Sequence, residues 1–281
     1  MIFDKLEKIL YRMYLTRFLE IAVEKNYKLG YVHGTYHLCI GEEASHIGVC
    51  FAMGKNDLLY NTHRGHGGAI GIGMDPNTVM AEIFGKKTGC SGGRGGSMHL
   101  CQPEIGYMGS NGIVGGNIPM GCGSAMAIKM QNISDKVVFV VIGDGATNEG
   151  SFHECLNMAS LWNLPVVIVC INNDYGVSTK QAHCCSEPSL VKRAESYNIY
   201  ADECVIDSVK KARWYALKNG PAFVELKTYR TCGHSRSDKN LYRTNDEIMS
   251  WEEKCPLKTF ETKLINDFGY TEKRLSEIKS H

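Results

Sequence analysis

The stretch Val137-Val-Phe-Val-Val-Ile-Gly-Asp-Gly145 joins a continuous apolar run to an aspartate between two glycines. A second apolar run, Pro165-Val-Val-Ile-Val-Cys-Ile171, leads into Asn172-Asn-Asp-Tyr175, and a helical pattern covers residues 151–162 between the runs. Two buried strands with a helix between them predict a parallel βαβ unit. Both polar motifs then follow the carboxyl ends of neighbouring strands, the edge at which open α/β sheets bind ligands.

The rest of the chain extends this unit into a layered α/β protein. Further strands are predicted at 57–60 and 222–226. Helical spacing of apolar residues predicts helices over 1–26, 42–53, 192–198, 207–217 and 246–267. We predict a three-layer α/β/α fold with a mainly parallel central sheet and helices on both faces. The sequence shows no internal repeat, so residues 1–281 are expected to form a single domain.

Two segments lack a clear periodic pattern. Residues 85–116 are rich in glycine but include apolar residues such as Ile113 and Val114, so we expect an ordered backbone close to a ligand instead of a disordered linker. The polar segment 233–244 is expected to be a mobile loop.

The composition excludes several classes of protein. Lys and Arg total 31 against 30 Asp and Glu, a net charge of +1, so no basic field suggests binding to nucleic acid or to an anionic membrane. No apolar run reaches the roughly 18–20 residues that span a bilayer. The charged start Met1-Ile-Phe-Asp-Lys-Leu-Glu-Lys8 does not resemble a signal peptide.

Cysteine usage points to reduced thiols. The 12 cysteines are scattered, with one adjacent pair at Cys184 and Cys185 and no CxxC motif. We therefore expect a cytoplasmic or similar compartment. The adjacent pair is interpreted as loop thiols, because His183 alone would not complete a zinc site beside it.

The residues around the two strand ends predict a cation–diphosphate site. Asp144 offers a carboxylate and Asn173 an amide oxygen, and Mg²⁺ prefers oxygen ligands while keeping phosphate oxygens as partners. Backbone N–H groups at Gly145 and Ala146 would face a phosphate at the start of a helix. The alternative role for Asp144, a simple helix cap, is less favoured because Asn173 follows the neighbouring strand at matched spacing.

This pairing of Gly-Asp-Gly with Asn-Asn resembles the thiamine diphosphate motif. The longer stretch from Gly143 to Pro165 (GDGATNEGSFHECLNMASLWNLP) resembles the alpha subunit of 2-oxo acid dehydrogenases. Further stretches of the same resemblance begin at His37, Gly93, Asn111 and Thr228, and together they span roughly residues 5–265. Thr62-His-Arg-Gly-His-Gly is closer to the acetoin and pyruvate types than to the branched-chain type.

The resemblance implies roles for individual residues. The Mg²⁺ ligands would be the side chains of Asp144 and Asn173 and the carbonyl of Tyr175. Contacts to the cofactor would come from His63, Arg64, Gly112, Val114, Gly145, Ala146 and His234. The catalytic groups would be His234, near the reacting carbon, and His37, which would reach the 2-oxo acid pocket; each could take part in acid–base chemistry. The other histidines, His46, His66, His99 and His153, are expected to be structural.

The resemblance also implies partners. A beta subunit would supply the activating Glu and the pyrimidine-side wall, giving an α2β2 assembly with an inactive isolated alpha chain. The substrate would be a small 2-oxo acid or acetoin, and the acyl group would pass to a lipoyl carrier or another acceptor. No nucleic acid or membrane partner is expected.

Three departures keep other functions open. A strand near 199–205 is expected to be shortened or lost relative to the family, the chain ends early at His281, and Cys232 precedes Gly233-His234 where many relatives have His or Arg. A two-subunit transketolase-like enzyme, a carrier-protein acyl or ketol transferase and an inactive scaffolding paralogue therefore remain alternatives. A dinucleotide-binding enzyme is disfavoured, because the glycine motifs at 71–75 and 93–97 lack the strand and helix that such a site needs.

Overall fold

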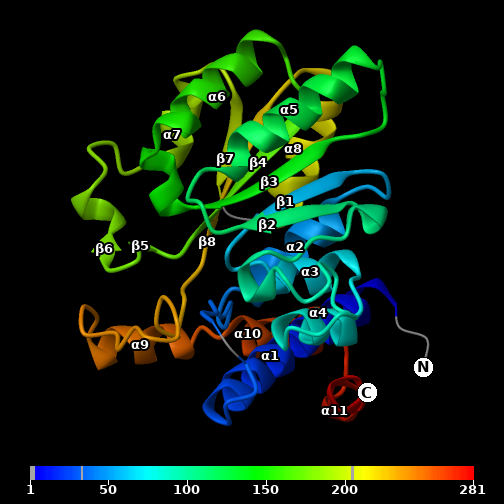
Figure 1. Ribbon diagram of the computed structural model, residues 1–281, viewed down its shortest axis with the longest axis vertical. Coiled ribbons are helices and arrows are strands. Elements are labelled where there is room, and N and C mark those ends of the chain that lie inside the picture. The colour runs from blue at the N-terminus through cyan, green and yellow to red at the C-terminus, as the bar shows by residue number, and fades with distance from the viewer. Residues whose placement is uncertain (1–3, 33, 204–205) are drawn as a thin grey trace.

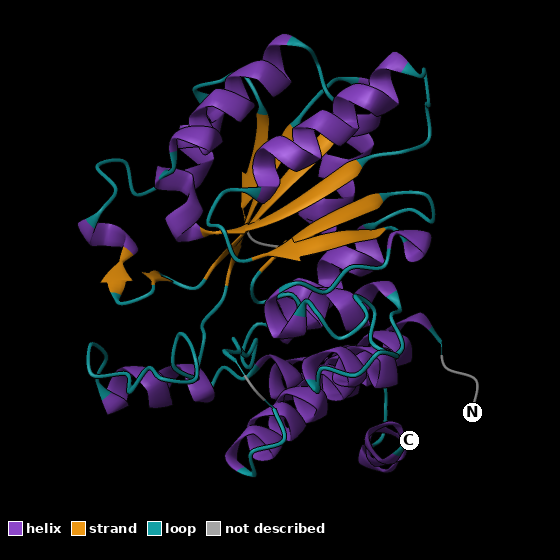
Figure 2. Cartoon of the chain, in the orientation of Figure 1, coloured by secondary structure: helices purple, strands orange, loops and turns teal. Residues whose placement is uncertain are grey.

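A six-stranded sheet forms the centre of the protein in a computed structural model that describes residues 4–32, 34–203 and 206–281. The strand order is β2-β1-β3-β4-β8-β7, and all five neighbouring pairs are parallel. The strands, in that order, are Tyr107–Asn111, Leu58–Thr62, Val138–Gly143, Val166–Asn172, Ala222–Lys227 and Tyr200–Glu203. Figures 1 and 2 show the sheet fanning out between layers of helices. The predicted parallel sheet is confirmed.

Alternate side chains of the central strands enter two separate cores. Val138, Val140 and Ile142 pack on one face beneath α5 (Asn117–Met130), α6 (Gly150–Leu161) and α7 (Leu190–Glu195). Phe139 and Val141 point to the other face, where α2 (Glu43–Ala52), α3 (His66–Ile72), α4 (Pro76–Ile83) and α8 (Ile206–Lys218) supply the facing side chains. A strand that is buried on both faces has a continuous run of apolar residues in its sequence, as residues 138–142 do. The three-layer α/β/α arrangement is therefore confirmed.

A third core joins the two ends of the chain. The long helix α1 (Lys5–Lys28) packs against α10 (Pro256–Phe268) and α11 (Glu272–Ser280) through Leu10, Met13, Leu264, Leu275 and Ile278. Figure 1 shows these helices together on the side away from α5 and α6. Asp4 and Glu7 form a reciprocal capping box at the start of α1, which fixes where this helix begins.

Pro256 divides the helix that was predicted over 246–267. The structure has α9 (Asn245–Glu252) and α10 instead, with Pro256 at the first turn of α10. Proline has no N–H to donate, and its ring clashes with the carbonyl four residues earlier, so a continuous helix cannot pass through this position. The prediction of one helix was wrong for that reason.

Two strands lie where the sequence pattern was weak. Tyr107–Asn111 forms β2 within the glycine-rich segment, which also contains two short 3₁₀ turns, Gly96–Met98 and Pro103–Ile105. Tyr200–Glu203 forms the edge strand β7, paired with β8, so the strand thought shortened or lost near 199–205 is present as four residues. Residues 204–205 of that segment lie outside the described residues.

Within the described residues, none of the helices combines the length and the apolar character needed to cross a membrane.

Candidate active site

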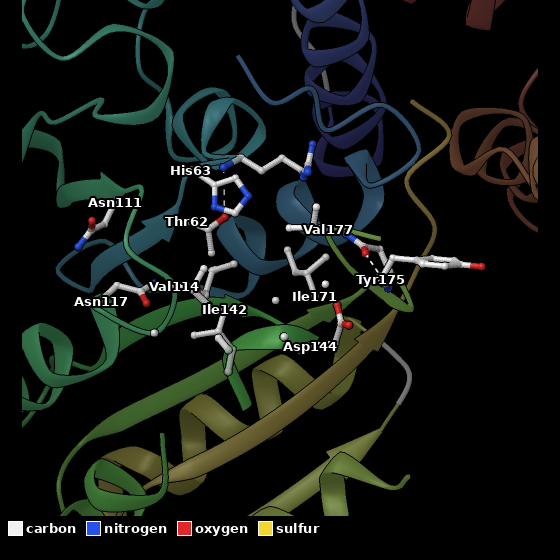
Figure 3. A pocket seen from close by; sticks show the side chains of 18 of the residues that line it. Thr62, His63, Asn111, Val114, Asn117, Ile142, Asp144, Ile171, Tyr175 and Val177 are labelled. Atoms are coloured by element: carbon white, nitrogen blue, oxygen red, sulfur yellow. Dashed lines mark hydrogen bonds between the residues drawn. The ribbon is translucent and has the colours of Figure 1, made fainter. Parts of the chain in front are cut away.

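A cavity lies at the carboxyl edge of the sheet, as the two motifs predicted. It encloses about 740 Å³, including the part open to solvent. Its lining comes from the ends of four adjacent strands: Thr62, His63 and Arg64 at β1, Asn111, Ile113, Val114 and Gly115 at β2, Gly143 to Ala146 at β3, and Asn173 and Tyr175 to Val177 after β4. Figure 3 shows Asp144, Ile142, Val114 and His63 around one space. Of the predicted site residues, all except His37 and Gly112 line this cavity, and His37 contacts two residues that do.

Asp144 has the surroundings expected of a cation ligand. It begins a 3₁₀ helix, η3 (Asp144–Asn148), and its side chain is buried. Burial, together with the nearby charges of Asp174 and Glu42, raises the pKa of its carboxyl to about 6, although backbone N–H groups oppose the shift. A buried carboxylate among other acids is costly by itself. A divalent cation would remove that cost, so the donor set fits a metal ion such as Mg²⁺.

The Asn173 amide is held in a fixed orientation. Its Nδ2 donates to Glu42 Oε1 at 2.8 Å, and its Oδ1 accepts from the Tyr175 N–H at 3.2 Å. Asp174 between them has a φ of 69° in a tight left-handed turn. The Tyr175 hydroxyl donates to Glu247, and Figure 3 shows its ring pointing away from the cavity. The backbone is therefore the part of Tyr175 that faces this site.

Glu42 connects the two sides of the site, a role that was missing from the sequence analysis. Its carboxylate is buried, with His46 Nε2 at 3.5 Å, Arg64 Nε at 3.9 Å and the Asn173 amide. Burial would raise the pKa of Glu42, but His46, Arg64 and Asn173 together hold it at about 2. The signal in the sequence was the pair of adjacent acids, Glu42 and Glu43, at the start of an otherwise apolar helix. Such a pair could equally mark a helix cap. His46, expected to be structural, lines the cavity beside Glu42.

Three histidines from distant segments meet at one end of the cavity. The ring centroids of His37 and His63 are 4.5 Å apart, those of His37 and His234 5.1 Å, and those of His63 and His234 5.5 Å. Burial, reinforced by neighbouring positive charge, lowers the pKa of His37 to about 2, of His63 to about 3 and of His234 to about 4. All three imidazoles are therefore neutral at neutral pH in the free chain.

This end of the cavity suits an anion. His37 Nδ1 is buried without a hydrogen-bond partner, and the guanidinium groups of Arg64 and Arg230 add positive potential at His63 and His234. The three ring nitrogens lie within 4.8 Å of one another and could also ligate a metal, but the two guanidinium groups disfavour a cation. A phosphate or carboxylate group would satisfy both the orphaned nitrogen and the positive potential.

Arg64 holds this cluster in place. Its Nη1 donates to the Leu38 carbonyl at 2.5 Å and its Nη2 to the His234 carbonyl at 3.1 Å. These bonds tie the segments of His37 and His234 to the end of β1. Arg64 was expected to contact the cofactor, and two of its nitrogens already donate to these backbone carbonyls.

Of the other histidines that were expected to be structural, His66 and His153 have hydrogen-bond partners within the fold, and His99 is exposed. His66 is fully buried between Glu20 Oε2 at 2.8 Å and Ser97 Oγ at 2.9 Å. His153 binds the Tyr197 hydroxyl at 2.8 Å. His99 is exposed and lies beside Gly112, which is itself exposed next to the cavity.

Known proteins resemble this chain over nearly its whole length. Residues 11–281 match the family "Dehydrogenase E1 component". The alpha subunit of acetoin:2,6-dichlorophenolindophenol oxidoreductase from Bacillus subtilis is 40% identical over 280 residues, covering 95% of this chain and 84% of that protein. The pyruvate dehydrogenase E1 alpha subunit of Rickettsia bellii is 37% identical over 275 residues, covering 95% and 84%. The alpha-1 subunit of the mitochondrial pyruvate dehydrogenase E1 component from Arabidopsis thaliana is 37% identical over 278 residues, covering 95% and 70%.

A solved thiamin diphosphate-dependent enzyme from Mycobacterium smegmatis aligns with 70% of this chain and 33% of its own, at a TM-score of 0.47 and 14% identity. The family match and the alpha-subunit relatives agree with the resemblance seen in the motifs. This chain belongs to the dehydrogenase E1 component family, among its alpha subunits.

Proposed function

We propose that this chain is the alpha subunit of a thiamine diphosphate-dependent dehydrogenase that decarboxylates a pyruvate-like 2-oxo acid or cleaves acetoin. The observation that carries the proposal is the cavity that gathers Asp144, Asn173, His63 and His234 at the carboxyl edge of the sheet. The names of its relatives, which are acetoin and pyruvate dehydrogenase alpha subunits, support the same substrate range.

The residues of the cavity divide the binding of the cofactor between them. Asp144, Asn173 and the Tyr175 carbonyl would hold Mg²⁺, and the N–H groups of Gly145 and Ala146 would face the diphosphate. Gly112 and Val114 would meet the ring system through their backbone. When bound, thiamine diphosphate supplies an electron sink for the carbon that loses CO₂.

The histidines would handle the anionic groups and the proton. As neutral imidazoles, His63 and His234 can donate an N–H to a phosphate oxygen, and the orphaned Nδ1 of His37 can serve a substrate carboxylate. An anion beside these rings favours the protonated imidazole, so binding would raise their pKa values toward neutrality. His37 and His234 could then hold and return a proton near the reacting carbon.

A second subunit would complete the site. Ile113 and Val114 at the cavity rim are 72% and 49% exposed, and the carboxylates among the lining residues are Glu42 and Asp144. The carboxylate of Glu42 already pairs with His46 and accepts a hydrogen bond from Asn173, and Asp144 is assigned to the metal. We therefore propose that a beta subunit supplies the activating Glu in an α2β2 assembly, and that a lipoyl carrier or another acceptor takes the acyl group.

The test is reconstitution with the partner. The chain is used as bait in its source cell with Mg²⁺ and thiamine diphosphate, and the recovered complex is assayed with pyruvate and with acetoin, using 2,6-dichlorophenolindophenol as electron acceptor. We expect dye reduction by the complex, none by the isolated chain, and about a hundredfold loss in an Asp144→Ala complex, since loss of a metal ligand weakens the binding of Mg²⁺ and of the diphosphate that it holds.

The alternatives give different results. Turnover by the isolated chain would contradict the need for a beta subunit. Ketol transfer from a ketose without dye reduction would favour a transketolase-like enzyme, and a complex that binds no cofactor would favour a scaffolding role.

A further inference from the structure

Two neighbouring thiols outside the cavity share one hydrogen-bonding partner. Cys184 and Cys185 follow the 3₁₀ turn η4 (Gln181–His183). The Asn148 side chain places its Nδ2 at 3.4 Å from Cys184 Sγ and 3.5 Å from Cys185 Sγ. Side chains of adjacent residues in extended backbone point to opposite sides. Here a φ of −128° and a ψ of 1° at Cys184 bring both sulfurs to the same amide.

These thiols contact the end of the segment that begins with Asp144. Asn148 is the last residue of η3. Arg193 of α7 donates to Cys185 Sγ at 3.3 Å, and also to the Thr147 carbonyl at 2.6 Å and the Thr147 hydroxyl at 3.0 Å. The thiol pair and Arg193 together hold the C-terminal end of η3, while Asp144 lies at its start.

The pair is open to small reagents. Cys184 is exposed and Cys185 half-buried, whereas Cys39, Cys122, Cys155 and Cys170 are buried. Among the described residues, the three-ligand metal group is formed by the histidines of the cavity, so these two thiols do not belong to one. Reaction with an oxidant is the chemistry left to an exposed thiol beside a half-buried one.

We propose that Cys184 and Cys185 are a redox modification site at which a low-molecular-weight disulfide such as oxidised glutathione forms a reversible disulfide between the two neighbours. The Cys185 thiolate attacks the reagent RSSR, giving the mixed disulfide Cys185–S–SR and releasing RS⁻. The Cys184 thiolate then attacks Cys185 Sγ, forms the Cys184–Cys185 bond and releases the second RS⁻. The two thiol protons leave with the products as two RSH, so two thiols are oxidised while one RSSR is reduced.

The ring formed in this way would be easy to reduce again. Adjacent Cα atoms are about 3.8 Å apart, which is shorter than the roughly 4.4–6.8 Å of ordinary disulfides. A strained disulfide has a more oxidising potential than a structural one. The pair therefore acts as a switch and not as a permanent cross-link.

Oxidation would release the end of η3. Once bonded to each other, the two sulfurs no longer accept from Asn148 and Arg193 in their present positions. Loss of such contacts weakens the positioning of the segment that carries Asp144, and the apparent affinity for thiamine diphosphate falls by about tenfold, the effect of one net hydrogen bond. This consequence rests on the proposed function, whereas the disulfide itself does not.

The disulfide is tested by peptide mass. Trypsin cuts after Lys180 and Lys192, and the peptide 181–192 contains both cysteines and no other. After treatment of the native chain with oxidised glutathione, we expect this peptide to lose about 2 Da, the two hydrogens of the thiols, and to regain them with dithiothreitol. Cys184→Ser should instead leave glutathione on Cys185. A peptide that stays a dithiol, or that carries two glutathiones, would overturn the proposal.

The effect on the cofactor is tested in the assembled complex. Thiamine diphosphate is titrated in excess Mg²⁺ before and after treatment with oxidised glutathione, with the wild type, the double variant Cys184→Ser/Cys185→Ser and the control Cys101→Ser. We expect the treatment to raise Kd about tenfold for the wild type and the control, and to leave Kd unchanged for the double variant, which has no thiol to modify at this site. An equal rise in the double variant would refute the switch. Absence of cofactor binding in the reduced wild type would refute the proposed function and leave the mass result standing.

Discussion

Asp144 destabilises the ligand-free chain because its charged form is buried. Its pKa rises from 3.8 to about 6 on folding, so the native state holds more protons than the unfolded chain between these values. The free energy of unfolding therefore falls as the pH rises through this window, and the full cost is present above it. The buried carboxylate therefore lowers the stability of the ligand-free chain, and it is available there to bind a cation.

We expect Asp144→Asn to stabilise the ligand-free chain at pH 7.5. A shift of about 2 pKa units corresponds to roughly 2–3 kcal/mol, and an amide avoids that cost. Denaturant unfolding at pH 7.5 and 4.5 would show a gain that is smaller at the lower pH. The same variant should lose the thermal shift that the wild type shows with Mg²⁺ and thiamine diphosphate. The exposed Asp267→Asn is the matched control, and equal behaviour of both variants would contradict this account.

The histidine cluster has the opposite pH dependence. The pKa of His63 is about 3 in the folded chain against 6.5 for the free side chain, chiefly because it is buried, so the unfolded chain takes up the proton first as the pH falls. The contribution of each such histidine to the free energy of unfolding is therefore fully present above pH 6.5. Below that pH the free energy of unfolding decreases by up to about 1.4 kcal/mol per pH unit for each such group.

Replacing His63 with Gln should flatten this dependence. Between pH 6.5 and 5 the slope of the unfolding free energy should decrease by up to one proton's contribution, about 1.4 kcal/mol per pH unit. The exposed His183→Gln should leave the slope unchanged. Chemical denaturation at closely spaced pH values measures both variants. A slope that His63→Gln leaves as steep as the wild type would show that this histidine protonates in the native state.

Helix α5 packs directly on the sheet because it has glycine where it crosses β3. A Cβ at Gly121 would lie 2.1 Å from Val140 Cγ2, whereas a Cβ at Gly123, two residues away, would meet nothing within 4 Å. The same residue type therefore has opposite roles on the two faces of one helix. The buried glycine is required by packing, and the exposed one only lowers helix propensity.

The two glycines provide a matched pair of variants. We expect Gly121→Ala to cost about 1–3 kcal/mol through overpacking against Val140. Gly123→Ala should stabilise the isolated chain by up to about 1 kcal/mol through helix propensity. Urea denaturation of the isolated chain gives both values. A neutral Gly121→Ala would mean that α5 can shift on the sheet without loss, contrary to the packing described.

Weak local signals explain the elements that the sequence analysis missed. Tyr107–Asn111 contains a glycine and two small polar residues, so its β propensity is low, and parallel pairing with β1 supplies its hydrogen bonds. Tyr200–Glu203 is an edge strand held by β8 alone in the described sheet. The break at Pro256, in contrast, was readable from the residue type.

The two ends of the chain stabilise each other across the molecule. Leu275 of α11 is 5% exposed in the core that it shares with Leu10 and Met13 of α1. Glu7 and Arg274 pair at the rim of the same contact, where solvent weakens the interaction. The apolar contact therefore accounts for most of the docking.

We expect Leu275→Ala to cost about 2–5 kcal/mol, the usual range for a buried leucine. Ile265→Ala on the outer side of α10, where the side chain is 36% exposed, should cost clearly less. Thermal and denaturant unfolding of both variants would decide this. A Leu275→Ala chain as stable as Ile265→Ala would show that α11 adds nothing to the fold.

The sequence by itself determined the parallel sheet and the position of the site. Both follow from local patterns: continuous apolar runs mark strands buried on both faces, and the polar residues that follow them must meet at one edge. For the same reason Asp144 and Asn173 could be placed in one site from the sequence pattern, whereas Val114 was assigned to it by the family resemblance.

Only the tertiary structure decided how the site is tuned. Glu42 lies more than a hundred residues from Asn173, and the neutrality of His37, His63 and His234 arises from burial among segments far apart in the chain. Orientation, desolvation and long-range charge depend on packing in three dimensions, and no spacing along the chain encodes them. The shared contact of Cys184 and Cys185 with Asn148 is of the same kind, because it brings a loop onto the 3₁₀ helix that begins with Asp144.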